Sequence, residues 1–371
     1  MPSIGDAIEL LDSWYRPGWA QSWDSVGLID GRTDSDLRVI HVAVDPATEV
    51  AKEAVTGGAQ LLITHHPLWL GGVDRMSGPS GEVFSTLHDA GCALFVAHTN
   101  ADVAAPGVSD ALADALGLTD LRVMTVQDEA LDHWLVHVPR EFVDSMLDVL
   151  SAAGAGRIGT YDRCAFTVEG TGTFRPLAGA DPFLGRIGEV ESVMEARVEF
   201  VGLPSERAGI ARALRAVHPY EEPSFAVTPT VTPSKRGLGR VGELPEGIPL
   251  RDFVTQVARL LPATAAGIRA TGPADLAVRT VAVAGGSCLE LNGDACRAGA
   301  DVYVTSDAKH HRAQDARLPI IDVPHWAGEW PWTAALGRRL RDALPGVSVH
   351  VSRLVTDPWT MAAGDRVDRM P

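Results

Sequence analysis

This sequence contains few cysteines, no long apolar run and no N-terminal targeting pattern. Its four cysteines, Cys92, Cys164, Cys288 and Cys296, are dispersed and form no C-x-x-C pair. This is typical of buried thiols in a reducing compartment rather than of disulfides or zinc sites. The chain does not open with a basic segment followed by an apolar one, and no apolar run approaches the roughly 20 residues that cross a membrane. We therefore expect a cytoplasmic protein with no signal peptide and no membrane contact.

Positive charge is also scarce. The 32 Lys and Arg residues are scattered among 48 Asp and Glu residues, which gives a formal net charge of -16. Because nucleic-acid binding needs a basic stripe to neutralise phosphates, we expect no nucleic-acid partner. The absence of a D-x-H or G-N-H-[DE] signature disfavours a metallophosphoesterase. The hydrophobic content of 46% in 371 residues suits a soluble protein of about two or three domains with substantial cores.

An apolar, β-branched strand beginning at Leu61 ends in the pair His65 and His66. A strand expected at 39–45 and a helix at 47–57 precede it, and this strand-helix-strand order predicts a parallel pair of strands. Open α/β sheets bind ligands at the carboxyl ends of such strands, so both histidines belong to a candidate site. For two adjacent histidines alone, a hydrogen-bonded pair in the core explains the pattern about equally well.

Three further strands are each followed by polar side chains suited to metal binding. These strands are expected at 92–97, 302–305 and 319–323, and the residues that follow them are His98, Asp102, Asp307, His311, His325 and Glu329. Residues four apart on a helix share one face, so His325 and Glu329 lie together if a helix begins after Pro324. His98 and Asp102 are expected at the same sheet edge as His65 and His66, and the other residues follow strand ends in the second half of the chain.

We interpret five residues as metal ligands: His65, His66, Asp102, His325 and Glu329. Zinc is the metal expected first for this mixed nitrogen and oxygen set, which manganese, iron and nickel also accept. Five ligands are too many for one open tetrahedral site, so we predict two divalent ions per chain with Glu329 as the bridge. Two such ions can share a bridging hydroxide, which indicates hydrolysis of a small-molecule substrate.

The remaining polar residues of the group are assigned as partners of the ligands or as proton carriers. They are His98, Asp45, Asp307 and His311. Metal-bound imidazoles need an acceptor on their second nitrogen, which nearby carboxylates provide. We favour His311 as the acid or base because Asp307 lies four residues before it, with His98 as the other candidate. For each of these residues alone, a polar surface position near the start of a helix is at least as probable.

Residues 124–235 have a different pattern from the segments on either side. The elements expected there are strands at 134–138 and 224–231, helices at 141–152 and 205–216, and short strands with Gly and Pro turns over 165–201. The order β-α-β-β-α-β is typical of a small ferredoxin-like sandwich of the α+β class. We therefore predict an α/β core in two halves, 1–123 and 236–371, with an inserted domain at 124–235.

Several motifs together resemble the Nif-three-like family, whose members are often labelled type 2 homologues of GTP cyclohydrolase I. The motifs of the core are Trp23–Leu28, Ile63–Pro67, His98–Asp102, Thr305–Asp307 with His311, and His325–Glu329. The insert resembles the PII/CutA-like domain of the longer bacterial members through Gly154–Gly159, Gly170–Pro176 and His218–Pro223. In three places the chain departs from the family pattern: Ser25 stands where Asn is usual, and Ser306 and Pro324 stand where Gly is usual.

The resemblance implies a two-metal α/β core and a homohexamer built as a trimer of dimers. Carried over by position, the family's ligands fall on the same five residues. The leading hypothesis is a metal-dependent hydrolase acting on a small nucleotide-like or cyclic amide substrate. The alternative is a metal-binding regulatory or scaffold hexamer whose insert senses a ligand or a partner. In that alternative His218–Pro223 is a contact surface or a ligand clamp, although a solvated turn explains this segment slightly better.

Overall fold

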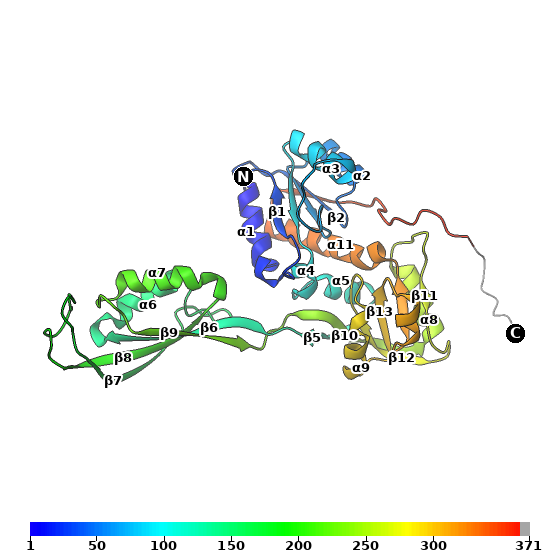
Figure 1. The fold of residues 1–371 in the computed structure, drawn as a ribbon. Helices are drawn as coiled ribbons and strands as arrows, with labels where there is room; N and C mark the ends of the chain where they lie inside the picture. The colour runs from blue at the N-terminus through cyan, green and yellow to red at the C-terminus, as the bar shows by residue number, and fades with distance from the viewer. Residues whose placement is uncertain (364–371) are drawn as a thin grey trace. The chain divides into compact units, whose positions relative to one another are not determined.

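The computed structural model describes residues 1–363, and the chain divides into two compact units. The larger unit consists of residues 1–127 and 235–371, and the insert consists of residues 128–234 (Figure 1). The α/β class of the core and the ferredoxin-like insert, both predicted from the sequence, are confirmed. The predicted insert range of 124–235 includes the end of a strand that pairs within the larger unit, so the insert begins four residues later.

The first sheet of the larger unit is mostly parallel. In spatial order its strands are β1 (Gly27–Asp30), β4 (Ala93–Val96), β3 (Leu61–Thr64), β2 (Val39–Ala43) and β15 (Ser348–Val351). Only β1 is antiparallel to its neighbour. The strand-helix-strand order predicted for β2 and β3 gives the expected parallel pair. The strand β15 comes from the C-terminal half of the chain, so both halves contribute to this sheet.

The second sheet has a parallel centre and antiparallel edges. In spatial order its strands are β11 (Arg269–Ala270), β14 (Ile320–Val323), β13 (Val302–Ser306), β12 (Ala277–Val283), β10 (Gly237–Pro249) and β5 (Thr119–Val126). The central strands β12, β13 and β14 run parallel, whereas β10 pairs antiparallel with both β12 and β5. Here it is β5, from the N-terminal half, that completes a sheet of the other half.

The helices of the larger unit are α1 (Ile4–Trp14), α2 (Thr48–Thr56), α3 (Gly78–Asp89), α4 (Thr99–Val103), α5 (Val108–Ala115), α8 (Leu250–Leu260), α9 (Asn292–Arg297), α10 (His310–Gln314) and α11 (His325–Ala343).

Two of these helices, α5 and α11, connect the two sheets. The long helix α11 contacts β2 and β15 of the first sheet, α5 contacts β10 of the second, and α5 and α11 pack together. Buried Trp332 of α11 lies in the same apolar cluster as Ile40 and Phe95 of the first sheet. This packing holds the carboxyl ends of both sets of parallel strands in one unit.

The insert follows the predicted order of elements. These are β6 (Glu129–Pro139), α6 (Val143–Ala152), β7 (Phe166–Phe174), β8 (Glu191–Gly202), α7 (Arg207–Val217) and β9 (Phe225–Thr232). The strands form an antiparallel sheet in the order β7-β8-β6-β9. Trp134 and Phe200 of the sheet pack with Met146 of α6 and Leu214 of α7 in a separate apolar core. Within residues 1–363, no helix is both long and apolar enough to cross a membrane.

Candidate metal centre

The polar residues that follow the parallel strands come together in the larger unit. His65 and His66 follow β3 directly, and Asp102 lies in α4, which follows β4. His325 and Glu329 lie four residues apart at the start of α11, so they share one face of that helix. The five predicted metal ligands therefore approach one another from the ends of both sheets.

Glu329 lies at the centre of this group, with its side chain only 3% exposed. Its Oε1 atom lies 3.0 Å from His325 Nε2 and 3.4 Å from His65 Nε2. Its Oε2 atom lies 3.0 Å from His66 Nε2. Asp102 also approaches His65, with its Oδ1 atom 3.7 Å from His65 Nε2. A carboxylate whose two oxygens face different imidazoles is suited to bridge two cations.

The second nitrogen of each of these imidazoles is held by an oxygen acceptor. Nδ1–H donates to the Ala97 carbonyl (2.8 Å) in His65, to Asp45 (2.6 Å) in His66 and to Asp307 (2.7 Å) in His325. These bonds fix the ring orientations and direct each Nε2 towards Glu329, as is usual for imidazoles that bind metals. The predicted roles of Asp45 and Asp307 as partners of the ligands agree with these contacts.

The contacts also shift the pKa values of the cluster. Burial alone would lower the pKa values of His66 and His325, but Glu329 and their second carboxylate partners outweigh it and raise them to about 10 and about 11. Burial would raise the pKa of Glu329, yet the surrounding imidazoles hold it well below its usual value. Burial raises the pKa of Asp102 to about 6. Since only neutral imidazoles coordinate metals, a cation that binds here must displace protons from the histidines.

The residues present fit a bound cation. His65 Nε2 and Glu329 Oε2 are buried, and neither atom makes a hydrogen bond, although each lies within 3.4 Å of another atom of the cluster. A buried polar atom without a partner costs about 1–3 kcal/mol, so two converging acceptors of this kind indicate a site built for a positive ligand. The imidazole nitrogens and carboxylate oxygens are the donor set expected first for zinc, and manganese, iron and nickel also accept it.

A glycine turn that the sequence reasoning did not assign to the site packs against Glu329. Gly286 follows β12 with a φ of +73°, and a Cβ atom there would lie 2.7 Å from Glu329 Oε1. Any side chain at this position would displace the central carboxylate. The signal in the sequence is the pair Gly285–Gly286 directly after a buried strand.

His98 lies in the same cluster. The ligand atoms of His65, His66 and His98 are all within 4.8 Å of one another, which makes His98 a further candidate ligand as well as a candidate proton carrier. Its Nδ1 atom lies 3.0 Å from Oδ1 of Asp24, whose side chain is fully buried. Asp24 also accepts hydrogen bonds from the backbone N–H and the hydroxyl of Thr99. Sequence reasoning gave Asp24 no role, although it belongs to one of the quoted motifs.

The structure does not bring His311 to the cluster. A cavity of about 1070 Å³ opens beside the site and is lined by Asp307 and His325 but not by His311. Asp307 has a positive φ of 55°, which turns the chain there so that its carboxylate contacts His325. His311 then lies on exposed α10, with its ring against that of His310. The preference for His311 as acid or base therefore has no support from this geometry, and His98 is the better placed of the two.

The Asp307 carboxylate allows a direct test of ligand positioning. We expect Asp307→Asn to weaken metal binding by roughly tenfold or more, because the charge that orients His325 and raises its basicity is lost. Asn tolerates the positive φ at this position, so the fold is retained. Competition with a chromophoric chelator measures the affinity, and Asp315→Asn on the exposed end of α10 is the matched control. Equal affinities in both variants would contradict a role for Asp307.

The three departures from the family pattern leave the site intact. Pro324 occupies the N-cap position of α11 with a φ of -57°, and the next residue, His325, still reaches Glu329. The backbone N–H of Ser25 donates to Asp24. Ser306 is fully buried, and its hydroxyl has no hydrogen-bond partner in the described chain. The structure offers no reason for the hydroxyl at that position.

Known proteins resemble the chain over nearly its whole length. The profile of the Duf34/NIF3 (NGG1p interacting factor 3) family matches residues 2–358. A Mycobacterium leprae protein named "GTP cyclohydrolase 1 type 2 homolog" is 44% identical over 370 residues, covering 97% of this chain and 96% of that protein. A Bacillus subtilis protein of the same name is 36% identical over 364 residues, covering 95% and 97%.

Solved structures also resemble the chain over nearly its whole length. The crystal structure of a Bacillus cereus protein related to NIF3 has a TM-score of 0.78 at 35% identity and covers 97% of this chain and 99% of that one. A Staphylococcus aureus protein has a TM-score of 0.79 at 28% identity, with the same coverage of both chains. The family predicted from the motifs is therefore confirmed, and the chain belongs to the Duf34/NIF3 family.

Proposed function

We propose that this protein is a hydrolase that holds two divalent cations, most simply zinc, in the cluster around Glu329. The observation that carries the proposal is the buried Glu329 carboxylate, whose two oxygens face three imidazoles oriented through their other nitrogens. His65, His66, Asp102, His325 and Glu329 would hold the cations. Bound cations would supply Lewis-acid polarisation of a carbonyl or phosphoryl oxygen and activation of water near neutral pH.

The cavity beside the cluster supports a small nucleotide-like or cyclic amide substrate. Its volume of about 1070 Å³ is large enough for such a molecule. Exposed Trp23 and Trp359 on its wall offer flat surfaces for a heterocyclic ring, and Lys309 brings positive charge for an anionic group. The name carried by the bacterial relatives is consistent with a nucleotide substrate. The chain's own part would be to position this substrate, with His98 placed to carry a proton.

The test is turnover with and without metal. Purified protein would be assayed against purine nucleotides and cyclic amides, then again after treatment with a chelator and after addition of zinc or manganese. We expect turnover that is lost on chelation and restored by one of the metals. Turnover that persists in the chelator, or freshly purified protein with almost no metal, would contradict the proposal.

A regulatory or scaffold hexamer is the second candidate function, and a cavity within the insert favours it. In this case the metals would hold the assembly together while the insert binds a ligand. Size-exclusion chromatography with light scattering separates the two roles of the metal. A hexamer that persists after complete metal removal would argue against metals as structural elements and leave the hydrolase as the stronger proposal.

A further inference from the structure

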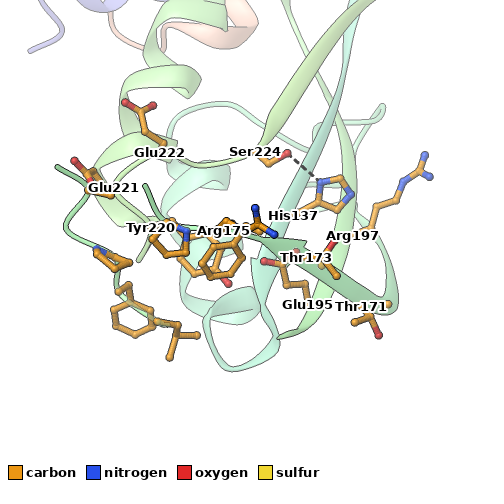
Figure 2. Close-up of a pocket in the computed structure, with 18 of the residues that line it drawn as sticks. His137, Thr171, Thr173, Arg175, Glu195, Arg197, Tyr220, Glu221, Glu222 and Ser224 are labelled. Carbon is orange, nitrogen blue, oxygen red and sulfur yellow. Dashed lines mark hydrogen bonds between the residues drawn. The ribbon is translucent and has the colours of Figure 1, made fainter. Parts of the chain in front are cut away.

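The insert has a cavity of its own that is open to the surface, with a volume of about 670 Å³. Every residue that lines it lies between His137 and Ser224, so the insert alone forms it. Its walls come from β6, β7 and β8, from the loop that follows β7, and from the segment that follows α7 (Figure 2). Small-molecule sites typically enclose about 300–1,000 Å³, so this cavity is of the right size for one compact ligand.

The motif His218–Pro223 shapes one wall of this cavity. Pro219 disfavours helical backbone at His218, and α7 ends at Val217. His218 Nε2–H donates to the His137 carbonyl (2.8 Å), and its Nδ1 accepts from the backbone N–H of Tyr220 (3.1 Å). Burial lowers the pKa of His218, which keeps the neutral form that these two bonds require. The imidazole therefore fixes Tyr220 at the cavity wall.

The loop that follows β7 is bonded to the motif His218–Pro223. Glu221 accepts a hydrogen bond from the backbone N–H of Asp181 in that loop (2.9 Å). The Phe183 ring lies against that of Tyr220 with ring centroids 6.3 Å apart, and Phe174 packs on Tyr220 at 5.9 Å. These three aromatic rings give the cavity an apolar side. The motif is therefore a built wall rather than a solvated turn.

A glycine in the second insert motif makes room for a carboxylate. A Cβ atom at Gly172 of β7 would lie 2.0 Å from Oε2 of Glu195, which reaches across from β8. Glycine at 172 thus allows the Glu195 carboxylate to lie against β7 and line the cavity. Glu195, Thr173, Arg175 and Tyr220 are among the lining side chains labelled in Figure 2.

Of the charged side chains that line the cavity, three are held by other groups, whereas Arg175, Glu195 and Glu222 make no ion pair with the described residues. Arg197 pairs with Glu199 at 2.9 Å, Glu169 pairs with Arg140, and Glu221 is bonded to the loop. Within residues 1–363, neither Arg175 nor Glu195 makes an ion pair, with each other or with any other residue. The Tyr220 hydroxyl is buried and faces the Glu195 carboxylate, and burial together with this negative charge raises the pKa of the hydroxyl. The cavity thus presents an unpaired guanidinium and two unpaired carboxylates beside an apolar wall, with the Tyr220 hydroxyl next to Glu195.

We propose that this cavity binds a free α-amino acid with an apolar side chain. The ligand carboxylate would pair with Arg175, its ammonium group with Glu195, and its side chain would pack on Phe174 and Phe183. A nucleotide phosphate fits less well, since its multiple negative charges would face Glu195 and Glu222, and Arg197 is already paired with Glu199. A simple amine would leave Arg175 unpaired. This inference does not depend on the hydrolase proposal, because every group that it uses lies in the insert.

The experiment titrates the full-length protein with each of the twenty amino acids by isothermal calorimetry and by thermal melting. We expect saturable binding of one or a few apolar amino acids and a rise in melting temperature with ligand concentration. The N-acetyl and the carboxamide derivatives of that amino acid each lose one charge, and each should bind roughly tenfold more weakly or worse. Arg175→Gln and Glu195→Gln should weaken binding of the parent amino acid by a similar factor.

Arg212→Gln on exposed α7 is the matched control, since it removes one charge of the insert away from the cavity. It should leave binding unchanged. Melting of each variant without ligand shows that the insert is still folded. The proposal is overturned if no amino acid binds, if the acetylated and amidated derivatives bind as well as the parent, or if the Arg175 and Glu195 variants retain full affinity. Binding of inorganic phosphate or ATP in place of amino acids would also overturn it and favour an anion site.

Discussion

Glu329→Ala is expected to reduce the metal content from about two ions per chain to one or fewer. Among the described residues, Glu329 is the only carboxylate that pairs with the Nε2 atoms of all three imidazoles, those of His65, His66 and His325. Without its carboxylate, only the three imidazoles and Asp102, which lies 3.7 Å from His65, remain as ligands. No side chain then bridges the two cation positions. The negative charge that offsets two cations in a buried site is lost at the same time.

Elemental analysis of protein purified without chelators measures this effect directly. Glu49→Ala, an exposed glutamate on α2, is the matched control and should retain the wild-type metal content. Circular dichroism and gel filtration show whether the Glu329 variant is folded, and Glu329→Gln repeats the test with side-chain volume preserved. Two ions per chain in folded Glu329→Ala would show that this carboxylate does not bridge them.

Local sequence pattern could predict which candidate ligands lie close together because each of them follows a parallel strand. The apolar strand before His65 and His66 could be read directly, and the spacing of His325 and Glu329 required only that a helix begin after Pro324. Carboxyl ends of neighbouring parallel strands meet at one edge, so no long-range information was needed to gather these residues. The structure places all five predicted ligands in one cluster.

The surroundings of the ligands were harder to predict, because they depend on contacts between distant segments. Asp24 reaches His98 across 74 positions in the sequence, and nothing near Asp24 indicates that partner. The preference for His311 was based on its spacing from Asp307, whereas one positive φ at Asp307 turns that carboxylate towards His325 instead. Spacing arguments hold within regular helices and strands and fail at such irregular turns.

The fold, too, could be predicted where it depends on local sequence pattern, but not where distant strands pair. The β-α-β-β-α-β order of the insert was predicted because each element carries its own periodicity. The exchange of strands between the two halves was not, since β15 pairs with β2, and β10 with β5, across more than a hundred residues. Short strands such as β15 have too few residues to show a pattern, and only the complete sheet gives them partners.

A buried ion pair that no sequence pattern indicated joins the two halves of the core. Arg240 of β10 is 2% exposed, and its guanidinium donates to both oxygens of Asp110 in α5 at 2.7 Å. It also donates to the carbonyls of Ala104, Gly237 and Gly239. Asp110 in turn accepts the backbone N–H of Gly107 at the start of α5. One side chain therefore satisfies oxygens from both chain halves.

We expect Arg240→Met to destabilise the protein by about 3–5 kcal/mol, because it leaves a partly buried carboxylate and three carbonyls without their donor. For a unit of this size that corresponds to a fall in melting temperature of roughly 10 °C. The matched control is Arg32→Met. Arg32 forms the same two-pronged pair with Asp34, but their side chains are 80% and 67% exposed, so its loss should leave melting unchanged. Addition of Asp110→Asn to Arg240→Met should recover part of the loss by removing the unpaired charge. Equal melting temperatures for the Arg240 and Arg32 variants would mean that burial does not set the strength of this pair.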